Sequence, residues 1–354
     1  MTSVNRQIRL ARRPVGRPDQ STWNLTEEPI PTPGDGEFVV TVDYVSLDPA
    51  MRGWLNDARS YVPPVGIGEV MRAHAVGRVL ESKHPDYAVG EIVSGSFGVS
   101  EHALSDGTGV QKVDESIAPA PTWLGALGFP GLTAYFGLMD VGKLTEGDTV
   151  VISGAAGAVG SIAGQIAKAK GATVIGIAGG PEKCAWLTEE LGFDAAIDYK
   201  AGVEPAERPG RNESVYKGLK AAAPQGIDVY FDNVGGEILD AALSRLRKGA
   251  RVVLCGAISG YNATDPQPGP AHYLSLLINR ASMTGFIIFD YLDRYQEGID
   301  ALSELLTSGK MTAREQIEIG GVTAFGSTLN LLFDGANTGK LVLEVGERTH
   351  DSEL

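Results

Sequence analysis

The sequence predicts an α/β protein that combines a doubly wound parallel sheet with a β-rich, barrel-like domain. The first observation is a β-branched run, a small-residue turn and an amphipathic helix in direct succession at 149–168. The second is the alternation of strand-like and helix-like segments from 129 to about 308, which is typical of a parallel sheet. The third is a return to short strand-like segments after 309, which indicates that the chain rejoins its first domain.

The first 128 residues are rich in Gly, Pro and Val and carry strand-like segments at 37–42 and 75–81. Turn residues separate these segments, which favours a barrel-like unit. We therefore expect domains at 1–128 and 129–308, with 309–354 completing the first of them. The last strand of that return is expected at 341–345.

Within the second domain, apolar runs bounded by turn residues predict five strands. They lie at 149–153, 173–178, 195–198, 227–232 and 250–255. A helix is expected from Pro181 to Leu191, and a loop-like stretch from Gly202 to Asn212.

The turn Gly154-Ala155-Ala156-Gly157-Ala158-Val159-Gly160 has the composition that a dinucleotide pyrophosphate needs. Small residues let the backbone approach the phosphates, and the following helix offers free N–H groups at its N-terminus. A strand before the turn and a helix after it are the context that supports this interpretation. The alternative is a glycine-rich packing turn in another α/β fold.

The end of the second predicted strand distinguishes the two nicotinamide cofactors. NAD-preferring proteins usually carry an acid there to bind the ribose hydroxyls, whereas this chain has Ala178-Gly179-Gly180. Lys183 follows at the start of the next helix, where an ammonium suits a phosphate. The sequence therefore favours NADPH, although Lys183 alone also fits an ordinary surface lysine.

Composition excludes several functional classes. The 354 residues carry a formal net charge of −14, which argues against nucleic acid and anionic membrane surfaces as partners. No apolar stretch approaches the roughly 18 residues of a membrane span, and the N-terminus lacks a secretory signal. The two cysteines, Cys184 and Cys255, fit a reducing compartment. We expect a cytoplasmic protein.

The layout resembles that of the medium-chain dehydrogenases/reductases. Zinc-binding members carry a cysteine and a Gly-His-Glu triplet where this chain has Ser46-Leu47-Asp48-Pro49 and Arg72-Ala73-His74-Ala75-Val76-Gly77. His74 lies where the glutamate of the triplet would be, so neither segment carries the zinc ligands. The five histidines show no metal-ligand spacing, so we expect no metal and a structural or surface role for His74. The resemblance implies a GroES-like β-barrel catalytic domain plus a Rossmann domain with a doubly wound parallel sheet.

Among zinc-independent members, the chain resembles the leukotriene B4 12-hydroxydehydrogenase/prostaglandin reductase group, which includes alkenal double-bond reductases and curcumin reductases. The segments that carry this resemblance span nearly the whole chain: 46–53, 131–135, 155–161, 230–236, 255–262 and 337–340. Ala50 departs from the group, in which many members carry tyrosine. The group often forms homodimers through the edge of the Rossmann sheet, and we expect a dimer here.

The resemblance also implies a set of cofactor contacts. Lys183 and Tyr199 would hold the 2′-phosphate, and Thr133, Phe286, Ile288 and Asn337 would line the nicotinamide end. The remaining expected contacts come from the turns that follow the strands: Ala156, Gly157, Ala158, Val159, Gly179, Asn233, Cys255, Ile258 and Ser259. Ile258, Phe286 and Ile288 equally fit core positions.

By the same resemblance, the expected reaction is NADPH-dependent reduction of the C=C bond of an α,β-unsaturated aldehyde or ketone. Hydride goes to Cβ, a proton goes to Cα, and the enolate oxygen needs a hydrogen-bond donor. Tyr261 is the expected donor, and an aromatic wall of the pocket is its alternative role. Arg52 either orients the substrate carbonyl or pairs with a carboxylate such as Asp48. Other interpretations are a quinone reductase, a secondary alcohol dehydrogenase and a non-catalytic NADPH-binding redox sensor.

Overall fold

The computed structural model describes residues 4–201 and 212–346, which form two compact units. The first unit joins the described residues up to Leu124 with those from Glu315 onward, and the second is Gly125–Arg314. The loop-like stretch expected from Gly202 lies outside the described residues up to its last member, Asn212, which caps a helix.

The unit boundaries lie at 124/125 and 314/315, not at 128/129 and 308/309 as expected. Hydrogen bonds give the reason at both places. The carbonyl of Gly125 accepts bonds from the N–H groups of Gly128 and Gly131, at the start of a helix of the second unit. Near the other boundary, the Gln165 side chain donates to the Thr312 carbonyl at 3.0 Å and accepts from the Thr312 N–H at 2.8 Å.

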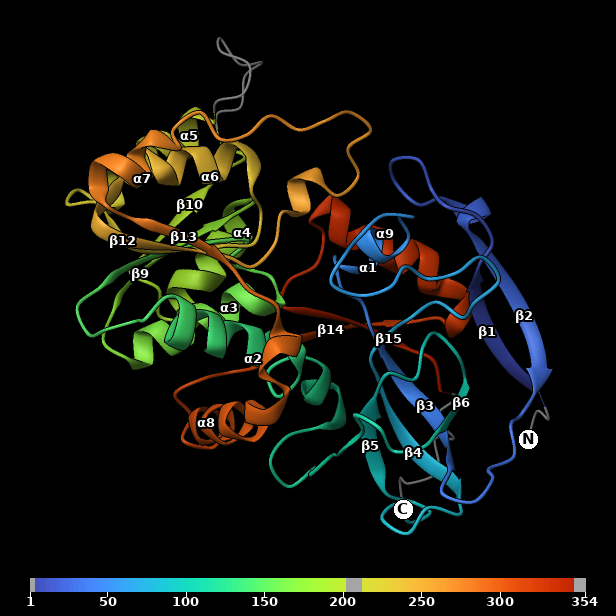
Figure 1. Ribbon diagram of the computed structural model, residues 1–354. Helices are drawn as coiled ribbons and strands as arrows, with labels where there is room; N and C mark the ends of the chain where they lie inside the picture. Colours follow the sequence, from blue (N-terminus) through green and yellow to red (C-terminus); the bar gives the residue numbers. More distant parts are fainter. Residues whose placement is uncertain (1–3, 202–211, 347–354) are drawn as a thin grey trace. The chain divides into compact units, whose positions relative to one another are not determined.

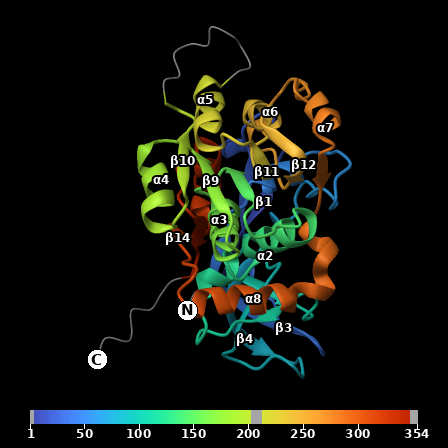
Figure 2. The same ribbon diagram turned by 90° about the vertical axis from the view of Figure 1, so that its left-hand side faces the viewer.

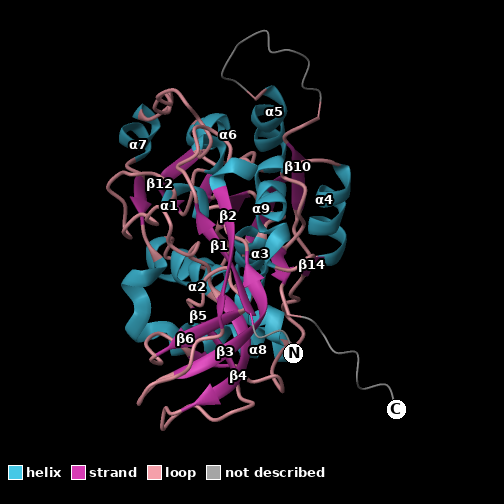
Figure 3. Cartoon of the chain, turned by 90° about the vertical axis from the view of Figure 1, so that its right-hand side faces the viewer, coloured by secondary structure: helices cyan, strands magenta, loops and turns pink. Residues whose placement is uncertain are grey.

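The first unit contains a sheet in the order β14-β15-β3-β4-β5-β7, with β6 also paired to β3. All its pairings are antiparallel except that of β14 with β15. The strands β3 to β6 lie together in Figure 3. The bounds are β3 Phe38–Ser46, β4 Ala75–Ser82, β5 Ile92–Gly95, β6 His102–Ser105, β7 Gln111–Lys112, β14 Glu315–Ile319 and β15 Lys340–Glu344.

A hairpin and a helix complete this unit. Strands β1 (Val4–Leu10) and β2 (Trp23–Pro29) pair with each other, and their residues share a core with helix α9 (Phe325–Asp334). The rings of Trp23 and Phe325 meet edge to face, with centroids 5.1 Å apart. The other helical segments are η1 Gln20–Thr22, α1 Met51–Trp54, η2 Ala120–Leu124 and η7 Val322–Ala324.

The second unit contains a parallel sheet in the order β10-β9-β8-β11-β12-β13. The labels β10, β9, β11 and β12 appear in that order across Figure 2. The bounds are β8 Thr149–Ser153, β9 Thr173–Ala178, β10 Ala195–Asp198, β11 Ile227–Asp232, β12 Leu246–Leu254 and β13 Ser282–Gly285. The first four predicted strands are confirmed, while β12 begins at Leu246 rather than at 250. Strand β13 was not predicted, because its sequence Ser-Met-Thr-Gly lacks a β-branched apolar run.

Helices cover both faces of this sheet, with α2, α3 and α8 on one side and α5, α6 and α7 on the other (Figure 1). The predicted helix at Pro181 is α-helical only to Ala185 and continues as a π-helical turn, η4. The bounds are α2 Phe129–Phe136, η3 Gly137–Val141, α3 Ala158–Ala169, α4 Pro181–Ala185, η4 Trp186–Glu190, α5 Glu213–Ala222, α6 Gly236–Leu243, η5 Ile258–Gly260, α7 Leu274–Asn279, η6 Ile288–Arg294 and α8 Tyr295–Thr307.

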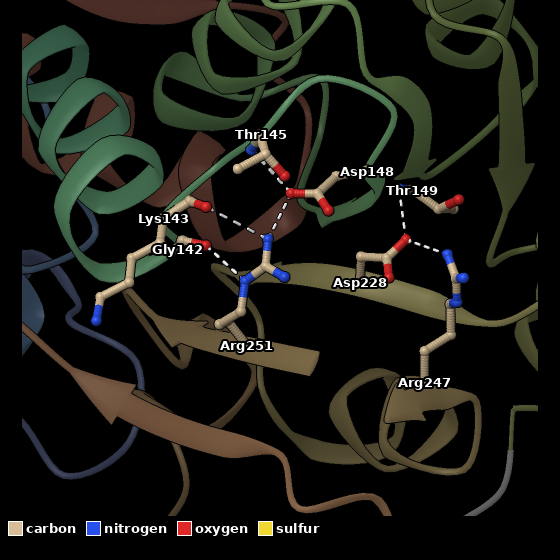
Figure 4. A network of polar contacts seen from close by, with 8 residues as sticks. All are labelled: Gly142, Lys143, Thr145, Asp148, Thr149, Asp228, Arg247 and Arg251. Atoms are coloured by element: carbon tan, nitrogen blue, oxygen red, sulfur yellow. Dashed lines mark hydrogen bonds and ion pairs between the residues drawn. The ribbon is translucent and has the colours of Figure 1, made fainter. Parts of the chain in front are cut away.

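Ion pairs and hydrogen bonds connect the strands β8, β11 and β12 near the amino ends of β8 and β11 (Figure 4). Asp228 of β11 accepts from the Thr149 N–H of β8 at 2.9 Å and from Arg247 of β12 at 2.7 Å. Arg251 of β12 binds Asp148 and the Gly142 carbonyl. The described residues include no helix long and apolar enough to cross a membrane.

Candidate cofactor and active site

The turn between β8 and α3 is tight and is built from glycine and alanine. Gly154 has a φ of +58°, which favours glycine, and its carbonyl accepts from the Gly157 N–H at 3.0 Å. A Cβ on Gly160 would lie 2.4 Å from the Gly154 oxygen, so α3 starts directly on the turn. Gly157 is the N-cap of this twelve-residue helix. The turn therefore offers backbone N–H groups and a helix N-terminus to an anion.

The strand order reverses between β8 and β11, which are adjacent in the sheet. In open parallel sheets, ligands bind beyond the carboxyl ends of the strands at such a reversal. Most of the predicted cofactor residues of this unit follow the carboxyl ends of the strands. These are Ala156 to Val159 after β8, Gly179 and Lys183 after β9, Tyr199 after β10, Asn233 after β11, Cys255, Ile258 and Ser259 after β12, and Phe286 and Ile288 after β13.

Two ammonium groups lie near the end of β9. A Cβ on Gly179 would come within 2.9 Å of both the Tyr199 ring and Lys200 Cε, so the turn, the ring and the lysine are in close contact. Lys200 Nζ lies 5.8 Å from the centre of the Tyr199 ring. Burial and the positive charge of Lys200 lower the pKa of Lys183. Such a concentration of positive charge suits a phosphate group.

A carboxylate also reaches this turn, although the strand β9 itself ends without one. Asp198 Oδ1 accepts from the Gly180 N–H at 2.8 Å and from the Lys200 N–H at 2.9 Å. Its charge is thus stabilised by backbone donors, and its hydrogen bonds fix the turn on which Gly179 lies.

The loop after β12 folds onto the loop after β11. Ser259 Oγ donates to the Val234 carbonyl at 2.6 Å, and the Ile258 N–H donates to the Asn233 carbonyl at 3.3 Å. The phenol oxygen of Tyr261 accepts from the Ala257 N–H at 3.2 Å, which turns the ring back over its own loop. An oxygen that accepts a hydrogen bond becomes a better donor through its own proton. Burial, and secondarily Asp232, raises the pKa of the Cys255 thiol to about 12.

Three predicted contacts of this unit come from its helical segments and the loop after β13. Thr133 lies in α2 and is partly exposed. Phe286 is half-buried, and its ring centre lies 6.5 Å from that of Tyr291. Ile288 is buried at the start of η6, and its carbonyl accepts from the Tyr295 hydroxyl at 3.1 Å.

Arg52 and Asn337 belong to the first unit. The Arg52 guanidinium donates to the Gly16 carbonyl at 2.9 Å and to Asn56 Oδ1 at 2.7 Å, while burial lowers its pKa. These bonds join helix α1 to the loop around Gly16, which is a structural role. Asn337 Nδ2 donates to the Gly339 carbonyl at 3.0 Å, at the start of β15.

The alternative pairing of Arg52 with Asp48 is not what the structure shows. Asp48 instead accepts from Lys340 Nζ at 2.7 Å and from the Ser46 hydroxyl. His74 lies beside them and shares a hydrogen bond of 2.8 Å with Ser94 Oγ. Burial lowers the pKa of His74 to about 4. Within 4–201 and 212–346, no three His, Cys, Asp or Glu side chains gather as metal ligands would.

Comparison with known families adds to this geometry. Residues 6–113 match the N-terminal domain of oxidoreductases, and residues 158–304 match the family described as zinc-binding dehydrogenase. A putative NADP-dependent oxidoreductase of Bacillus subtilis, YfmJ, is 43% identical over 98% of this chain and 99% of its own length. The NADPH-dependent curcumin reductase of Escherichia coli is 42% identical over 96% of this chain and 97% of its own. Bovine prostaglandin reductase 1 is 37% identical over 93% and 96%.

The chain belongs to the zinc-independent medium-chain dehydrogenases/reductases. Among solved structures, CurA of Vibrio vulnificus in complex with NADPH superposes with a TM-score of 0.89 at 43% identity, covering 97% of this chain and 99% of that one. A quinone oxidoreductase of Pseudomonas syringae, at 23% identity and a TM-score of 0.74, shares the medium-chain fold.

Two residues beside the predicted contacts had no predicted role. Lys200 follows Tyr199 directly, but an exposed lysine gives no signal in a sequence. Asp232 lies in the segment 230–236 that carries the family resemblance, and it accepts a hydrogen bond from Ser153, which is remote in the chain.

Proposed function

We propose that this medium-chain reductase uses NADPH to reduce the C=C bond of α,β-unsaturated aldehydes and ketones. The observation that carries the cofactor assignment is the pair of ammonium groups, Lys183 and Lys200, around Tyr199 and the glycine turn after β9. The closed turn at Gly154 fits a pyrophosphate, because it leads into the N-terminus of α3, which offers backbone N–H groups to an anion. The named relatives, an NADPH-dependent curcumin reductase among them, support the same reaction.

Each part of the site has a task in this proposal. Ala156, Gly157, Ala158 and Val159 bind the pyrophosphate through the N-terminus of α3, and Lys183, Lys200 and Tyr199 bind the 2′-phosphate. The walls of the cofactor site beyond β11 and β12 are formed by Asn233, Cys255, Ile258 and Ser259. Gly179, which has no side chain, leaves room for the ribose. Thr133, Phe286, Ile288 and Asn337 remain candidate contacts of the nicotinamide. When bound, NADPH supplies the hydride.

In this proposal, Tyr261 is the hydrogen-bond donor that stabilises the enolate oxygen. Reduction at Cβ leaves negative charge on the carbonyl oxygen, which a preorganised hydroxyl stabilises. The Ala257 N–H fixes the phenol oxygen at 3.2 Å, so the loop holds the hydroxyl in place. The phenol then donates a hydrogen bond to the enolate oxygen. Either the phenol or water delivers the proton to Cα. Arg52 takes no part in this step, since its guanidinium binds loop carbonyls.

A steady-state assay with a panel of acceptors tests the proposal. NADPH consumption is followed at the absorbance band of the reduced nicotinamide with 2-alkenals, aryl enones, quinones and the corresponding saturated aldehydes. We expect turnover with enals or enones and none with saturated aldehydes. Turnover with quinones alone would identify a quinone reductase, and binding of NADPH without turnover of any acceptor would identify a sensor. Either result would contradict the proposal.

We further propose that the enzyme is a cytoplasmic homodimer that pairs through β13. Ser282, Met283, Thr284 and Gly285 are all exposed at the edge of the parallel sheet. Leu277 and Ile278 of α7, which packs on β12, are 74% and 67% exposed. An uncovered strand edge beside apolar side chains is a surface that proteins normally cover. The two free cysteines, Cys184 and Cys255, suit a reducing compartment.

A further inference from the structure

Asp232 is a buried carboxyl at the last position of β11, directly at the reversal of strand order. Its side chain and backbone are 1% exposed. One oxygen, Oδ1, accepts four hydrogen bonds: from Ser153 Oγ at 2.7 Å, Tyr230 OH at 2.9 Å, the Gly235 N–H at 3.0 Å and the Val234 N–H at 3.2 Å. A single oxygen thus collects donors from two strands and one turn.

These donors join two of the loops that would hold the cofactor. Ser153 ends β8 and leads into the Gly154 turn, while Val234 and Gly235 form the turn into α6. The Ser153 hydroxyl also accepts from the Asn233 N–H at 2.9 Å, and the Ser153 carbonyl accepts from Asn233 Nδ2 at 2.7 Å. Asp232 and Ser153 therefore fix the spacing between the two loops.

The backbone carbonyl of Asp232 binds a third loop, the one that follows β12. Its carbonyl accepts from the N–H groups of Cys255 and Gly256, at 2.9 and 3.0 Å. The segment that follows β12 and carries Tyr261 therefore begins on the same residue. The loops after β8, β11 and β12 converge on Asp232 although they are distant in sequence.

The burial of the Asp232 carboxyl is energetically unfavourable, and a contribution to stability does not by itself explain it. Asp232 Oδ2 is buried and accepts no hydrogen bond from the described residues. Burial raises the pKa of this carboxyl although the four donors act in the opposite direction. An unsatisfied buried oxygen is unfavourable, so its presence calls for a reason. An acceptor that aligns three loops at once supplies one.

We propose that Asp232 is the positioning residue of the cofactor site. Its Oδ1 sets the distance between the backbone N–H groups of the Gly154 turn and those of the Asn233–Gly236 turn, so that both meet the same dinucleotide. This inference rests on the proposed function, since it assumes that NADPH binds at these loops. Asp232 acts through the loops and does not itself touch the cofactor.

Asp228 provides a matched control from the same strand. It also lies on β11 and also bonds to β8, through the Thr149 N–H at 2.9 Å, but at the amino end of the sheet (Figure 4). Loss of either carboxylate weakens the β8–β11 pair, whereas only the loss of Asp232 disturbs the loops. Tyr230→Phe is a second control, because it removes a donor to Oδ1 that belongs to the strand.

The experiment compares Asp232→Ala, Asp232→Asn, Ser153→Ala, Asp228→Ala and Tyr230→Phe with the wild-type enzyme. NADPH Kd is measured by fluorescence titration, KM for NADPH and kcat by steady-state kinetics, and melting temperature by calorimetry. We expect Asp232→Ala and Ser153→Ala to raise Kd and KM for NADPH about tenfold while kcat at saturating NADPH changes little. Asp232→Asn keeps the acceptor oxygen and should restore Kd to within about threefold of wild type. The two controls should lower the melting temperature and leave Kd unchanged.

Two results would overturn the inference. One is a Kd for Ser153→Ala equal to that of the wild type. The other is an increase in Kd for Asp228→Ala as large as that for Ser153→Ala, which would assign the effect to general weakening of the sheet. If Asp232→Ala does not fold, the comparison of Ser153→Ala with Asp228→Ala decides the matter. Failure of the wild-type chain to bind NADPH would instead refute the proposed function.

Discussion

Lys340, which is buried, and Asp48, which is partly exposed, form an ion pair of 2.7 Å between residues that are 292 positions apart in the chain. The Lys340 side chain is 3% exposed, and its ammonium also donates to the Leu47 carbonyl at 2.8 Å. Lys340 is the first residue of β15, and Asp48 follows β3. The pair therefore fastens the C-terminal strand to the sheet in which it lies.

We predict that Lys340→Met destabilises the first unit by about 3 kcal/mol, because it leaves a carboxylate without its buried partner. The double variant Asp48→Asn/Lys340→Met should recover part of that loss. Urea unfolding followed by tryptophan fluorescence measures the effect, since the first unit contains three of the four tryptophans: Trp23, Trp54 and Trp123. A double variant less stable than Lys340→Met would contradict this role of the pair.

A second prediction concerns His74, whose pKa burial lowers from 6.5 to about 4. The unfolded chain binds this proton more tightly than the folded chain does, so His74 contributes stability above pH 6.5. That contribution, on the order of 3 kcal/mol, is lost as the pH falls from about 6.5 to about 4. Unfolding of His74→Asn should depend less on pH across this window. An unchanged slope would show that other groups produce the acid sensitivity.

The third prediction addresses cofactor choice. Lys183→Ala should lower kcat/KM for NADPH by about tenfold to a hundredfold, because it removes a charged partner of the 2′-phosphate, and should leave NADH kinetics unchanged. Lys200→Ala should act in the same direction but less strongly, since Lys200 is exposed. Lys170→Ala, at the exposed end of α3, is the control. Equal losses with both cofactors would remove these lysines from the phosphate site.

Because the pKa of Lys183 is lowered, its charge is lost at a lower pH than that of an ordinary lysine. As the pH rises, the affinity for NADPH should accordingly begin to fall at a lower pH than it would with an ordinary lysine, whereas the affinity for NADH should not fall. Titrations of both cofactors between neutral and alkaline pH test this difference.

The fourth prediction concerns Tyr261. Tyr261→Phe should lower kcat for an enone by about a hundredfold, because the enolate oxygen loses its donor, while NADPH Kd stays the same. Tyr273→Phe, an exposed tyrosine of the same connecting segment, should have no effect. If kcat survives in Tyr261→Phe, the tyrosine serves only as a wall of the pocket.

The fifth prediction tests the dimer. Leu277→Glu places a charge on the apolar surface of α7 and should convert the dimer into a monomer in light scattering coupled to gel filtration. Ile319→Glu changes an equally exposed side chain of β14, in the other unit, and should leave the dimer intact. A wild-type monomer would refute the proposal directly.

The sequence predicted the fold well where local chemistry determines it. The strands β8, β9 and β11 are buried apolar runs, Gly154 has a positive φ, and Gly160 has no room for a Cβ, so strands and turn leave a clear pattern. Strand β13 was not predicted, because its residues are exposed and lack that pattern.

The candidate site was predictable only in part, for a related reason. Lys183 is predicted from its place after a strand, and Tyr199 is predicted from the family resemblance; both remain predicted contacts of the 2′-phosphate. The partners of Asp232, Asp48 and Arg52 come from distant segments or from backbone carbonyls, neither of which a sequence displays.

The interior position of β15 also affects how the protein is made. Strand β3 leaves the ribosome early, but its neighbour β15 is translated only after the whole of Gly125–Arg314. At the usual rate of about 5 to 20 residues per second, the nascent β3 edge waits on the order of 15 to 60 seconds for its partner. The second unit, which is continuous in the chain, can fold during that interval. A premature stop codon after residue 314 would accordingly leave a complete nucleotide-binding unit attached to an incomplete sheet with an open edge, a form that invites aggregation and proteolysis.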